Sequence, residues 1–456
     1  MSTTTIPPTQ NARLPGPAIP GWSQWLMKLW PWRVGFDALG FQLKGARQYG
    51  NFYAIWVGNK PVYIVSNPSL AHEILVERAK EFHKAELVRQ AVGPFAGKGL
   101  FTSEDAFWRS QRKLAQPAFH HQRIAAYGTT MVQQTGEMLA GWQAGETRDI
   151  AQAMVKLTLG IVNKTLFNID VRAQADQIGE LMLVILEGAN DRINNYDPIW
   201  RHIFKAHTRR EAVATQELFQ IIEGIIAQHR RQNEDTGDLL SMLLTARDEQ
   251  GEPMSDQQLR DEVITLFIAG HETTANALAW ALYLIAQHPA VEEQLLTELD
   301  ALQGNSPSIQ KLAHLPYSEQ VIKEALRLYP PAPGITRQPI HDIELAGYRI
   351  AKGSDIAIST YVMHRDPTIF HAPERFDPDR FRPENEAKLP SYAYLPFGGG
   401  PRVCIGNSFA MMEARLILAT VLQRFKLRLA PGQTVSAEQL FTLRPKGGLK
   451  MSVQAR

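Results

Sequence analysis

The distribution of apolar positions predicts a mostly helical protein with β-structure near both ends of the chain. Two β-rich segments, 52–57 and 61–66, flank Gly58-Asn59-Lys60, which predicts a hairpin. From residue 68 to about 330 the apolar residues recur at helical spacing. Short β-rich segments at 345–350 and 354–360 follow, then a helix at about 407–424 and a β tail. We therefore expect a mainly α, α-rich α+β fold with small sheets.

The longest predicted helix covers residues 255–287. Ser255 is a suitable N-cap and His288-Pro289 a suitable stop. No linker-like segment divides the chain after residue 35. We expect a partly disordered N-terminal lead-in over residues 1–35 and a single domain over residues 36–456.

Composition narrows the choice of partners and compartment. The 456 residues carry a formal net charge of +2, which gives no reason to expect a nucleic-acid partner. No apolar run is long enough to span a membrane, and the N-terminus lacks the pattern of a signal peptide. The lone cysteine, Cys404, excludes an internal disulfide and indicates a reducing compartment. We expect a cytoplasmic monomer.

One segment near the N-terminus leaves two interpretations open. It is crowded with tryptophan, at Trp22, Trp25, Trp30 and Trp32. These rings either pack on the body of the domain or form a surface helix that makes peripheral contact with a membrane.

The sequence around the lone cysteine is unusual. Residues 397–406 read Phe-Gly-Gly-Gly-Pro-Arg-Val-Cys-Ile-Gly and precede a predicted helix. Glycines allow a flat group to approach the backbone. Free N–H groups and the helix dipole favour a thiolate at Cys404, which suits an iron ligand. A reactive redox cysteine and a packed apolar cysteine are the alternatives.

This loop resembles the cysteine signature of the cytochrome P-450 family, Phe-x-x-Gly-x-Arg-x-Cys-x-Gly. Its fixed positions are filled by Phe397, Gly400, Arg402, Cys404 and Gly406. The resemblance implies the cytochrome P-450 fold and haem b (iron protoporphyrin IX), with Cys404 as the iron ligand and with Phe397, Gly398 and Gly406 beside the porphyrin. The sequence of residues 94–108 is most similar to that of the soluble bacterial fatty-acid-hydroxylase branch of the family.

A second motif lies inside the long predicted helix, at residues 269–274 (Ala-Gly-His-Glu-Thr-Thr). Read alone, it could be an incidental glycine beside a solvated acid. It resembles the family's oxygen-binding motif, which implies that Thr273 hydrogen-bonds dioxygen and Glu272 feeds protons. Ala269 and Gly270 would then lie against the haem, with Gly270 at a kink. We expect His271 to be an ordinary polar contact, because no second metal ligand is spaced for it.

Further charged residues fit the same resemblance. Glu324 and Arg327 are similar to the family's Glu-x-x-Arg element, which implies a structural ion network with Arg375 of Pro373-Glu374-Arg375-Phe376. Haem propionates need cationic or N–H partners. The residues that the resemblance assigns to them, each of which could instead be an ordinary surface residue, are Trp108, Arg112, Arg337, Arg402 and Lys84.

An apolar substrate pocket is also implied. The matching residues, any of which could equally belong to the core, are Phe101, Phe267, Ala269, Gly334, Ile335 and Phe441.

The implied activity is a monooxygenase that inserts one atom of O₂ into a fatty acid, terpenoid, steroid or similar apolar compound. We find no dinucleotide-binding turn, so we expect a separate ferredoxin or flavodoxin with its NAD(P)H-dependent reductase. Such partners are acidic, and Arg109, Lys113 and Arg415 are predicted to form a basic docking patch. The alternatives are a peroxide-driven peroxygenase and a non-enzymatic haem-thiolate sensor or carrier.

Overall fold

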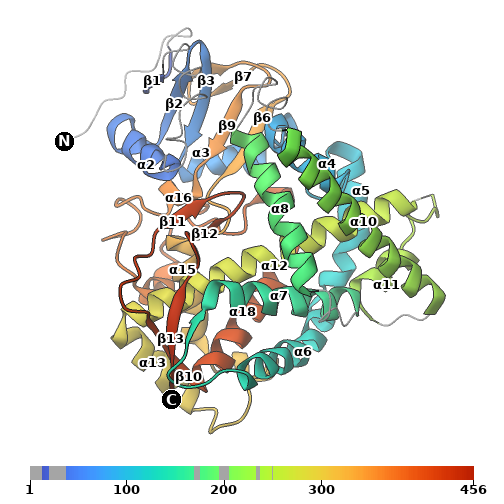
Figure 1. Cartoon of the computed structure of the whole chain (residues 1–456). Helices are drawn as coiled ribbons and strands as arrows, with labels where there is room; N and C mark the ends of the chain where they lie inside the picture. The colour runs from blue at the N-terminus through green and yellow to red at the C-terminus, as the bar shows by residue number, and fades with distance from the viewer. Residues whose placement is uncertain (1–12, 20–36, 169–174, 195–204, 233–236, 249) are drawn as a thin grey trace. The chain divides into compact units, whose positions relative to one another are not determined.

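The computed structural model describes residues 13–19, 37–168, 175–194, 205–232, 237–248 and 250–456 (Figure 1). Two compact units can be distinguished, and each is described by itself. The sheet unit comprises Met1–Arg89, Ala332–Arg375 and Lys388–Cys404, and the helical unit comprises Gln90–Pro331, Phe376–Ala387 and Ile405–Arg456. The tryptophan-rich segment lies outside the described residues, and the predicted single domain from residue 36 onward stays a prediction.

The sheet unit is built on a six-stranded sheet of order β1-β2-β3-β9-β6-β4. In that order the strands are Ala18–Ile19, Phe52–Val57, Lys60–Val65, Asp355–Ile358, Ile335–Pro339 and Phe82–His83. A separate hairpin pairs β7 (Ile343–Leu345) with β8 (Tyr348–Ile350). The helices and helical turns of this unit are α2 (Ala38–Tyr49), α3 (Pro68–His72), η2 (Glu73–Glu77), η3 (Ala79–Glu81), α16 (Thr360–Met363) and η6 (Gly400–Arg402).

The hairpin of β2 and β3 is confirmed. Val57 pairs with Lys60 across a two-residue turn, and Gly58 has a φ of +61°, which glycine adopts without strain. Alternate residues of β3 and β9 face one apolar core together with the π-helical turn η2. That core includes Tyr63, Val65, Ile74, Leu75, Ile356 and Ile358.

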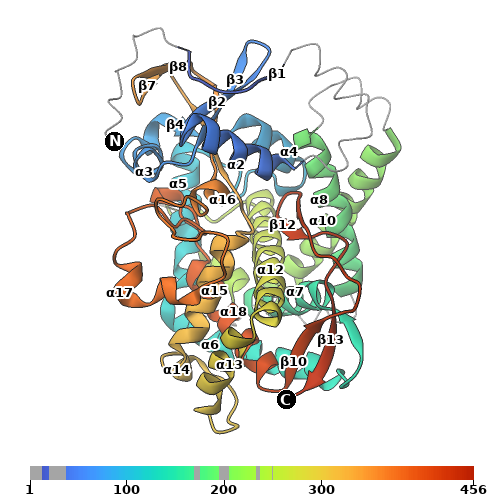
Figure 2. The same ribbon diagram turned by 90° about the vertical axis from the view of Figure 1, so that its left-hand side faces the viewer.

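The helical unit contains most of the helices (Figures 1 and 2). They are α5 (Asp105–Ala115), η4 (Gln116–Phe119), α6 (His121–Ala140), α7 (Ile150–Phe167), α8 (Ala175–Asn194), α10 (Lys205–Gln232), α11 (Leu239–Thr245), α12 (Asp256–Gln287), α13 (Pro289–Asp300), α14 (Ile309–Leu312), α15 (Pro316–Leu328), η5 (Pro378–Phe381), α17 (Pro383–Glu386) and α18 (Asn407–Leu422). Helix α4 (Glu86–Ala96) spans the sequence division between the two units.

Two small sheets complete the helical unit. One has the order β10-β13-β5, with strands Phe425–Leu429, Lys450–Ala455 and Thr147–Asp149. The other pairs β11 (Ala437–Gln439) with β12 (Leu443–Pro445). The predicted α-rich α+β fold with small sheets is confirmed, although strand β5 was not predicted.

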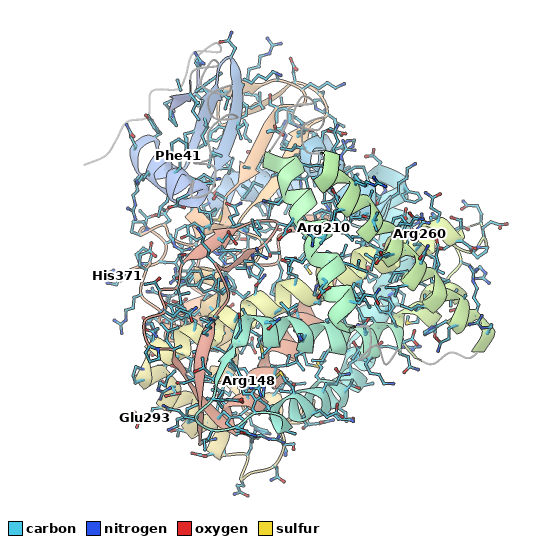
Figure 3. All side chains as sticks on the ribbon, viewed as in Figure 1. Phe41, Arg148, Arg210, Arg260, Glu293 and His371 are labelled. Carbon is cyan, nitrogen blue, oxygen red and sulfur yellow. The ribbon has the colours of Figure 1, made fainter. Side chains whose placement is uncertain are left out.

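Helix α12 is the central helix of this unit and confirms the predicted helix. Ser255 caps it through a capping box with Gln258, and His288 ends it. It packs along α7 and also against α15 and α18 (Figure 2). Near its N-terminus Arg260 reaches α10, with its guanidinium over the ring of Phe219 (Figure 3). Among the described residues, no helix combines the length and apolar character needed to span a bilayer.

Candidate active site

The cysteine loop is a tightly folded segment of the sheet unit. The Cys404 amide donates to the Phe397 carbonyl at 2.9 Å, and the Val403 amide donates to the Gly400 carbonyl at 3.1 Å. These bonds fix the backbone on both sides of η6. The Cys404 side chain is nevertheless exposed, whereas a structural cysteine is usually buried. The packed interpretation of Cys404 is therefore not supported.

Glycine is required in this loop for close packing. Gly400 has a φ of +66°, and a Cβ there would lie 1.8 Å from the Leu75 carbonyl oxygen. A Cβ at Gly399 would lie 2.5 Å from the ring of Tyr392, whose hydroxyl accepts from the Gly400 amide at 3.1 Å. The loop is thus held against η2 and Tyr392 with no room for side chains.

The predicted propionate partners of the sheet unit differ in burial. Arg337 on β6 is buried, and one of its guanidinium nitrogens donates to the Thr336 carbonyl at 2.8 Å. Arg402 and Lys84 are half-buried. A Cβ at Gly398 would lie 3.7 Å from Ile335, so these two predicted residues lie close together. Their roles toward haem or substrate stay predictions.

One turn in the middle of α12, residues 269–273, is more accessible than the buried stretches on either side of it. Ala269 is exposed, although Phe267, Ile268 and His271 around it are buried. The Thr273 hydroxyl donates to the Ala269 carbonyl at 2.7 Å, one turn back along the helix. The small side chain at 269 and the hydroxyl at 273 therefore share the open face.

Gly270 has a packing role that the sequence did not reveal. A Cβ at this position would lie 3.0 Å from a methyl group of Val162 on α7. The missing side chain allows α7 to approach α12 closely, and α12 is helical without interruption from Asp256 to Gln287. Close helix packing is therefore one reason for a glycine at this position, and the predicted kink at Gly270 stays a prediction.

Glu272 and His271 face different surroundings. One carboxylate oxygen of Glu272 accepts from the Thr442 hydroxyl at 2.7 Å. His271 is buried, and its Nδ1 lies 2.9 Å from the Phe267 carbonyl. Burial lowers the pKa of His271, so it is neutral. The described part of the chain holds no cluster of three or more potential metal ligands, and the role of His271 as an ordinary polar contact stays a prediction.

The predicted substrate contacts in the helical unit separate into two groups. Phe101 and Phe441 are half-buried and form an edge-on pair with ring centroids 6.1 Å apart. Phe267 is fully buried and packs on Phe167 of α7 at 6.1 Å. Phe267 therefore packs in the core of the helical unit, and its role as a substrate contact stays a prediction.

The loop that carries Phe101 is anchored to α12 by two adjacent carboxylates that sequence reasoning missed. The Lys98 amide donates to Asp261 at 2.8 Å, and the Leu100 amide donates to Glu262 at 3.0 Å. Both acids are buried, and burial raises the pKa of Glu262 to about 8. The sequence signal that could have indicated this contact is a pair of adjacent acids near the start of an apolar predicted helix, together with a loop that contains glycines.

Helix α5 presents two kinds of side chain. Trp108 and Arg112 are one turn apart, and Trp108 is almost fully buried. Arg109 and Lys113 are exposed on the same helix. The helix therefore separates the predicted propionate partners from the predicted docking residues, and both roles stay predictions.

The Glu324–Arg327 pair lies in the interior of the helical unit. Two hydrogen bonds, of 2.7 and 2.8 Å, join the carboxylate and the guanidinium, and both side chains are fully buried. Arg380 on η5 also reaches Glu324, at 3.3 Å. Burial raises the pKa of Glu324 in spite of these partners.

Arg380 was missed, although its sequence carried a signal. Pro378-Asp379-Arg380-Phe381 repeats the pattern of Pro373-Glu374-Arg375-Phe376 five residues later, and only the first copy was chosen. Arg375 belongs to the sheet unit, and its place in the network stays a prediction.

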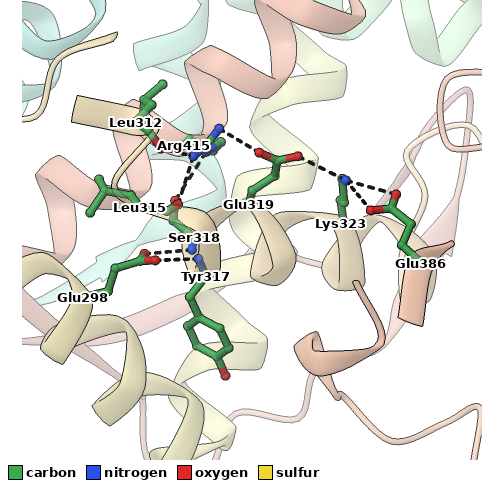
Figure 4. Close-up of polar contacts among 9 residues, drawn as sticks. All are labelled: Glu298, Leu312, Leu315, Tyr317, Ser318, Glu319, Lys323, Glu386 and Arg415. Carbon is green, nitrogen blue, oxygen red and sulfur yellow. Dashed lines mark hydrogen bonds and ion pairs between the residues drawn. The ribbon is translucent and has the colours of Figure 1, made fainter. Parts of the chain in front are cut away.

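Arg415 is not available for docking, which corrects that prediction. Its guanidinium forms an ion pair with Glu319 at 2.9 Å and also donates to the carbonyls of Leu312 and Leu315 (Figure 4). Its side chain is only 13% exposed. Arg415 instead ties α18 to α15 and to the segment that precedes α15.

The residues fit a haem-thiolate group on two independent observations. The sheet unit exposes a single thiol on a glycine loop closed by backbone hydrogen bonds. The helical unit exposes an alanine, next to the Thr273 hydroxyl, between two buried stretches of α12. Thiolate is the protein ligand of haem iron in P-450 enzymes, and a flat ring needs small residues beside it.

Comparison with known proteins agrees with this chemistry. A sequence model of the cytochrome P450 family matches residues 20–452. Cyclooctatin synthase from Streptomyces melanosporofaciens is 37% identical over 412 residues, which cover 90% of this chain and 89% of the relative. Cyclooctat-9-en-7-ol 5-monooxygenase from the same organism is 34% identical and covers 85% and 84%. Pentalenene oxygenase from Streptomyces avermitilis is 31% identical and covers 90% and 91%.

Proposed function

Because the chain belongs to the cytochrome P450 family of haem-thiolate monooxygenases, which bind haem b, we propose that it hydroxylates a terpenoid hydrocarbon or terpenoid alcohol. Two similar proteins are named for oxidising pentalenene and cyclooctat-9-en-7-ol. The half-buried Phe101–Phe441 pair offers an apolar surface that suits such compounds. The fatty-acid-hydroxylase branch remains the competing prediction.

In this proposal Cys404 would be the iron ligand of haem. The residues that would hold the ring are Phe397, Gly398, Gly406, Ala269 and Gly270. The residues that would bind its propionates are Trp108, Arg112, Arg337, Arg402 and Lys84. When bound, haem supplies the activation of dioxygen for the reaction R–H + O₂ + 2e⁻ + 2H⁺ → R–OH + H₂O.

The chain favours the thiolate form of Cys404. The residue lies three positions before the first residue of α18, a helix of 16 residues. Helix N-termini carry free N–H groups and partial positive charge, which lower the pKa of a nearby thiol. Backbone hydrogen bonds within the glycine loop hold the Cys404 backbone in place.

The observation that carries the proposal is the open turn of α12. An acid, Glu272, and a hydroxyl, Thr273, adjoin an exposed alanine between two buried stretches of α12, residues 261–268 and 274–282. We assign Glu272 to proton supply and Thr273 to holding the transferred proton at its Oγ1. A carrier or a sensor has no need of such a pair.

Electrons come from a separate redox partner, as is normal in this family. We propose an acidic ferredoxin or flavodoxin that docks on α5, where Arg109 and Lys113 are exposed. Complementary charge speeds such encounters and makes them sensitive to salt.

The substrate class is tested with a panel of pentalenene, progesterone and lauric acid. Each compound is added to the purified haem-loaded enzyme, and both the spin-state change of the haem and the product formed with ferredoxin, reductase and NADPH are measured. We expect pentalenene to be bound and hydroxylated in preference to the others. Faster hydroxylation of lauric acid would reverse the assignment of substrate class.

Thr273→Ala tests the proton role with the same assay. We expect NADPH consumption to continue while product per NADPH falls by about tenfold or more. Thr297→Ala is the matched control, because the Thr297 hydroxyl makes the same one-turn hydrogen bond, to the Glu293 carbonyl, on an exposed face of α13. Equal coupling in the two variants would contradict the proton role.

A further inference from the structure

Glu272 is held by a residue that neither the sequence motif nor the family assignment includes. The Thr442 hydroxyl donates to Oε1 of Glu272 at 2.7 Å, across 170 positions of sequence. Thr442 lies in the turn between β11 and β12, immediately after Phe441. All of these residues belong to the helical unit.

Asn276 sets the direction of this hydrogen bond. It lies one turn after Glu272 on α12, and its Nδ2 donates to the Thr442 hydroxyl oxygen at 3.0 Å. Because that oxygen already accepts from the amide, its own proton is directed to the carboxylate. Thr442 and Asn276 are 3% and 4% exposed, so water does not compete for these contacts.

The backbone next to Thr442 is fixed by the same helix. The Trp280 indole N–H donates to the Leu443 carbonyl at 3.0 Å, and the Leu443 amide donates to the Pro331 carbonyl at 3.0 Å. The Trp280 ring is stacked on Tyr329, with centroids 3.9 Å apart. Thr442 therefore approaches Glu272 from a rigid support.

The two oxygens of Glu272 are in different states. Oε1 is taken by Thr442, whereas Oε2 is buried and has no hydrogen-bond partner among the described residues. The Thr273 hydroxyl donates to Ala269 and not to Glu272. One oxygen is thus anchored, and the other is left to exchange a proton.

We infer that Thr442, oriented by Asn276, is a positioning residue that holds one oxygen of Glu272 so that the other delivers protons. This inference rests on the proposed role of Glu272. A hydroxyl on the β11–β12 turn thus fixes the orientation of the Glu272 carboxylate on α12.

The test compares Thr442→Val, which removes the hydroxyl at constant shape, with Thr442→Ser, which keeps it. Each haem-loaded variant is assayed with the panel compound that the wild type hydroxylates fastest. We measure product per NADPH, the solvent isotope effect in D₂O, and substrate affinity from the spin-state change. We expect Thr442→Val to lose about three- to tenfold in coupling with a larger isotope effect, and Thr442→Ser to resemble the wild type.

Two further variants separate this inference from the role of Glu272. Because Thr442 acts through the acid, adding Thr442→Val to Glu272→Gln should cause no further loss of coupling. Coupling that falls in Glu272→Gln but stays normal in Thr442→Val overturns the inference alone. Normal coupling in Glu272→Gln overturns the role of Glu272 and the inference with it.

A structural readout does not depend on turnover. Crystal structures should show the Glu272 carboxylate displaced in Thr442→Val and retained in Thr442→Ser. Asn276→Ala, which frees the Thr442 hydroxyl to rotate, should shift coupling in the same direction as Thr442→Val and serves if that variant does not fold. The contrary result is a Glu272 carboxylate that stays in place in Thr442→Val and in Asn276→Ala, with coupling equal to that of the wild type.

Discussion

Replacement of Arg327 by methionine gives a sharp test of how the interior of the helical unit is held together. Arg327 and Glu324 are fully buried and joined by two short hydrogen bonds. Methionine fills a similar volume but removes the two hydrogen bonds from Arg327, while the Glu324 carboxylate keeps the Asp377 amide at 2.9 Å and Arg380 at 3.3 Å. Removal of one partner from a buried pair costs about 3–5 kcal/mol.

The matched control lies on the same helix. Lys323 pairs with Glu319 at 3.1 Å and with Glu386 at 2.8 Å, but its side chain is 21% exposed (Figure 4). Lys323→Met also removes a positive charge, and we expect it to cost about 0–1 kcal/mol because solvent screens the pair. The two variants thus separate burial from charge.

The free energy of unfolding is obtained from urea denaturation of the haem-loaded enzyme, followed by far-UV circular dichroism. Glu324→Leu combined with Arg327→Met should recover much of the loss, because no charge is then buried without a partner on α15. Costs for Arg327→Met and Lys323→Met that agree within about 1 kcal/mol would refute the reasoning.

Three other predictions follow from the structure. Because burial raises the pKa of Glu262 from 4.5 to about 8, the folded protein keeps a proton that the unfolded chain releases. The free energy of unfolding should then fall by up to about 1.4 kcal/mol per pH unit as the pH rises between those two values, and it should level off above them. Glu262→Gln should remove this pH dependence in urea titrations across the same range. Equal pH dependence in the variant and the wild type would contradict the prediction. Gly400→Ala should abolish most haem incorporation, measured as haem absorbance per protein, because its Cβ meets a carbonyl at 1.8 Å, whereas Gly432→Ala, with a φ of +76° and open space around it, should retain haem. Charge reversal at Arg109 and Lys113 should slow the reduction of the haem-loaded enzyme by an acidic ferredoxin at least threefold, and it should weaken the salt dependence of that rate in stopped-flow measurements. Unchanged rates would show that α5 is not part of the docking surface.

The parts of the fold that depend on local sequence could be predicted. Helix α12 was found within one residue because its capping residues and its apolar run are contiguous in the chain. Strand β5 was not found, because Thr147–Asp149 is short and polar and has no strand signal of its own. It is a strand because β13 pairs with it, and Lys450 lies opposite Asp149. Tertiary pairing of this kind has no local signature.

The candidate site divides in the same way. The cysteine loop and the acid–threonine turn are contiguous motifs and were identified from their residues. Arg380 was missed because two similar motifs, ending in Phe376 and Phe381, compete for Glu324 and the sequence does not tell which one reaches it. Thr442 was missed because its contact with Glu272 spans 170 positions. The burial of Phe267 was not foreseen, because position along a helix does not by itself tell which face meets the core.

The anchoring of the loop at residues 97–102 has a consequence for evolution of specificity. Asp261 and Glu262 hold this loop through its backbone amides and not through its side chains. The side chain at position 101 can therefore be exchanged while the loop keeps its course, since every residue except proline supplies the same N–H groups nearby. Single substitutions at position 101 could therefore change substrate preference during evolution while the backbone of the loop stays the same.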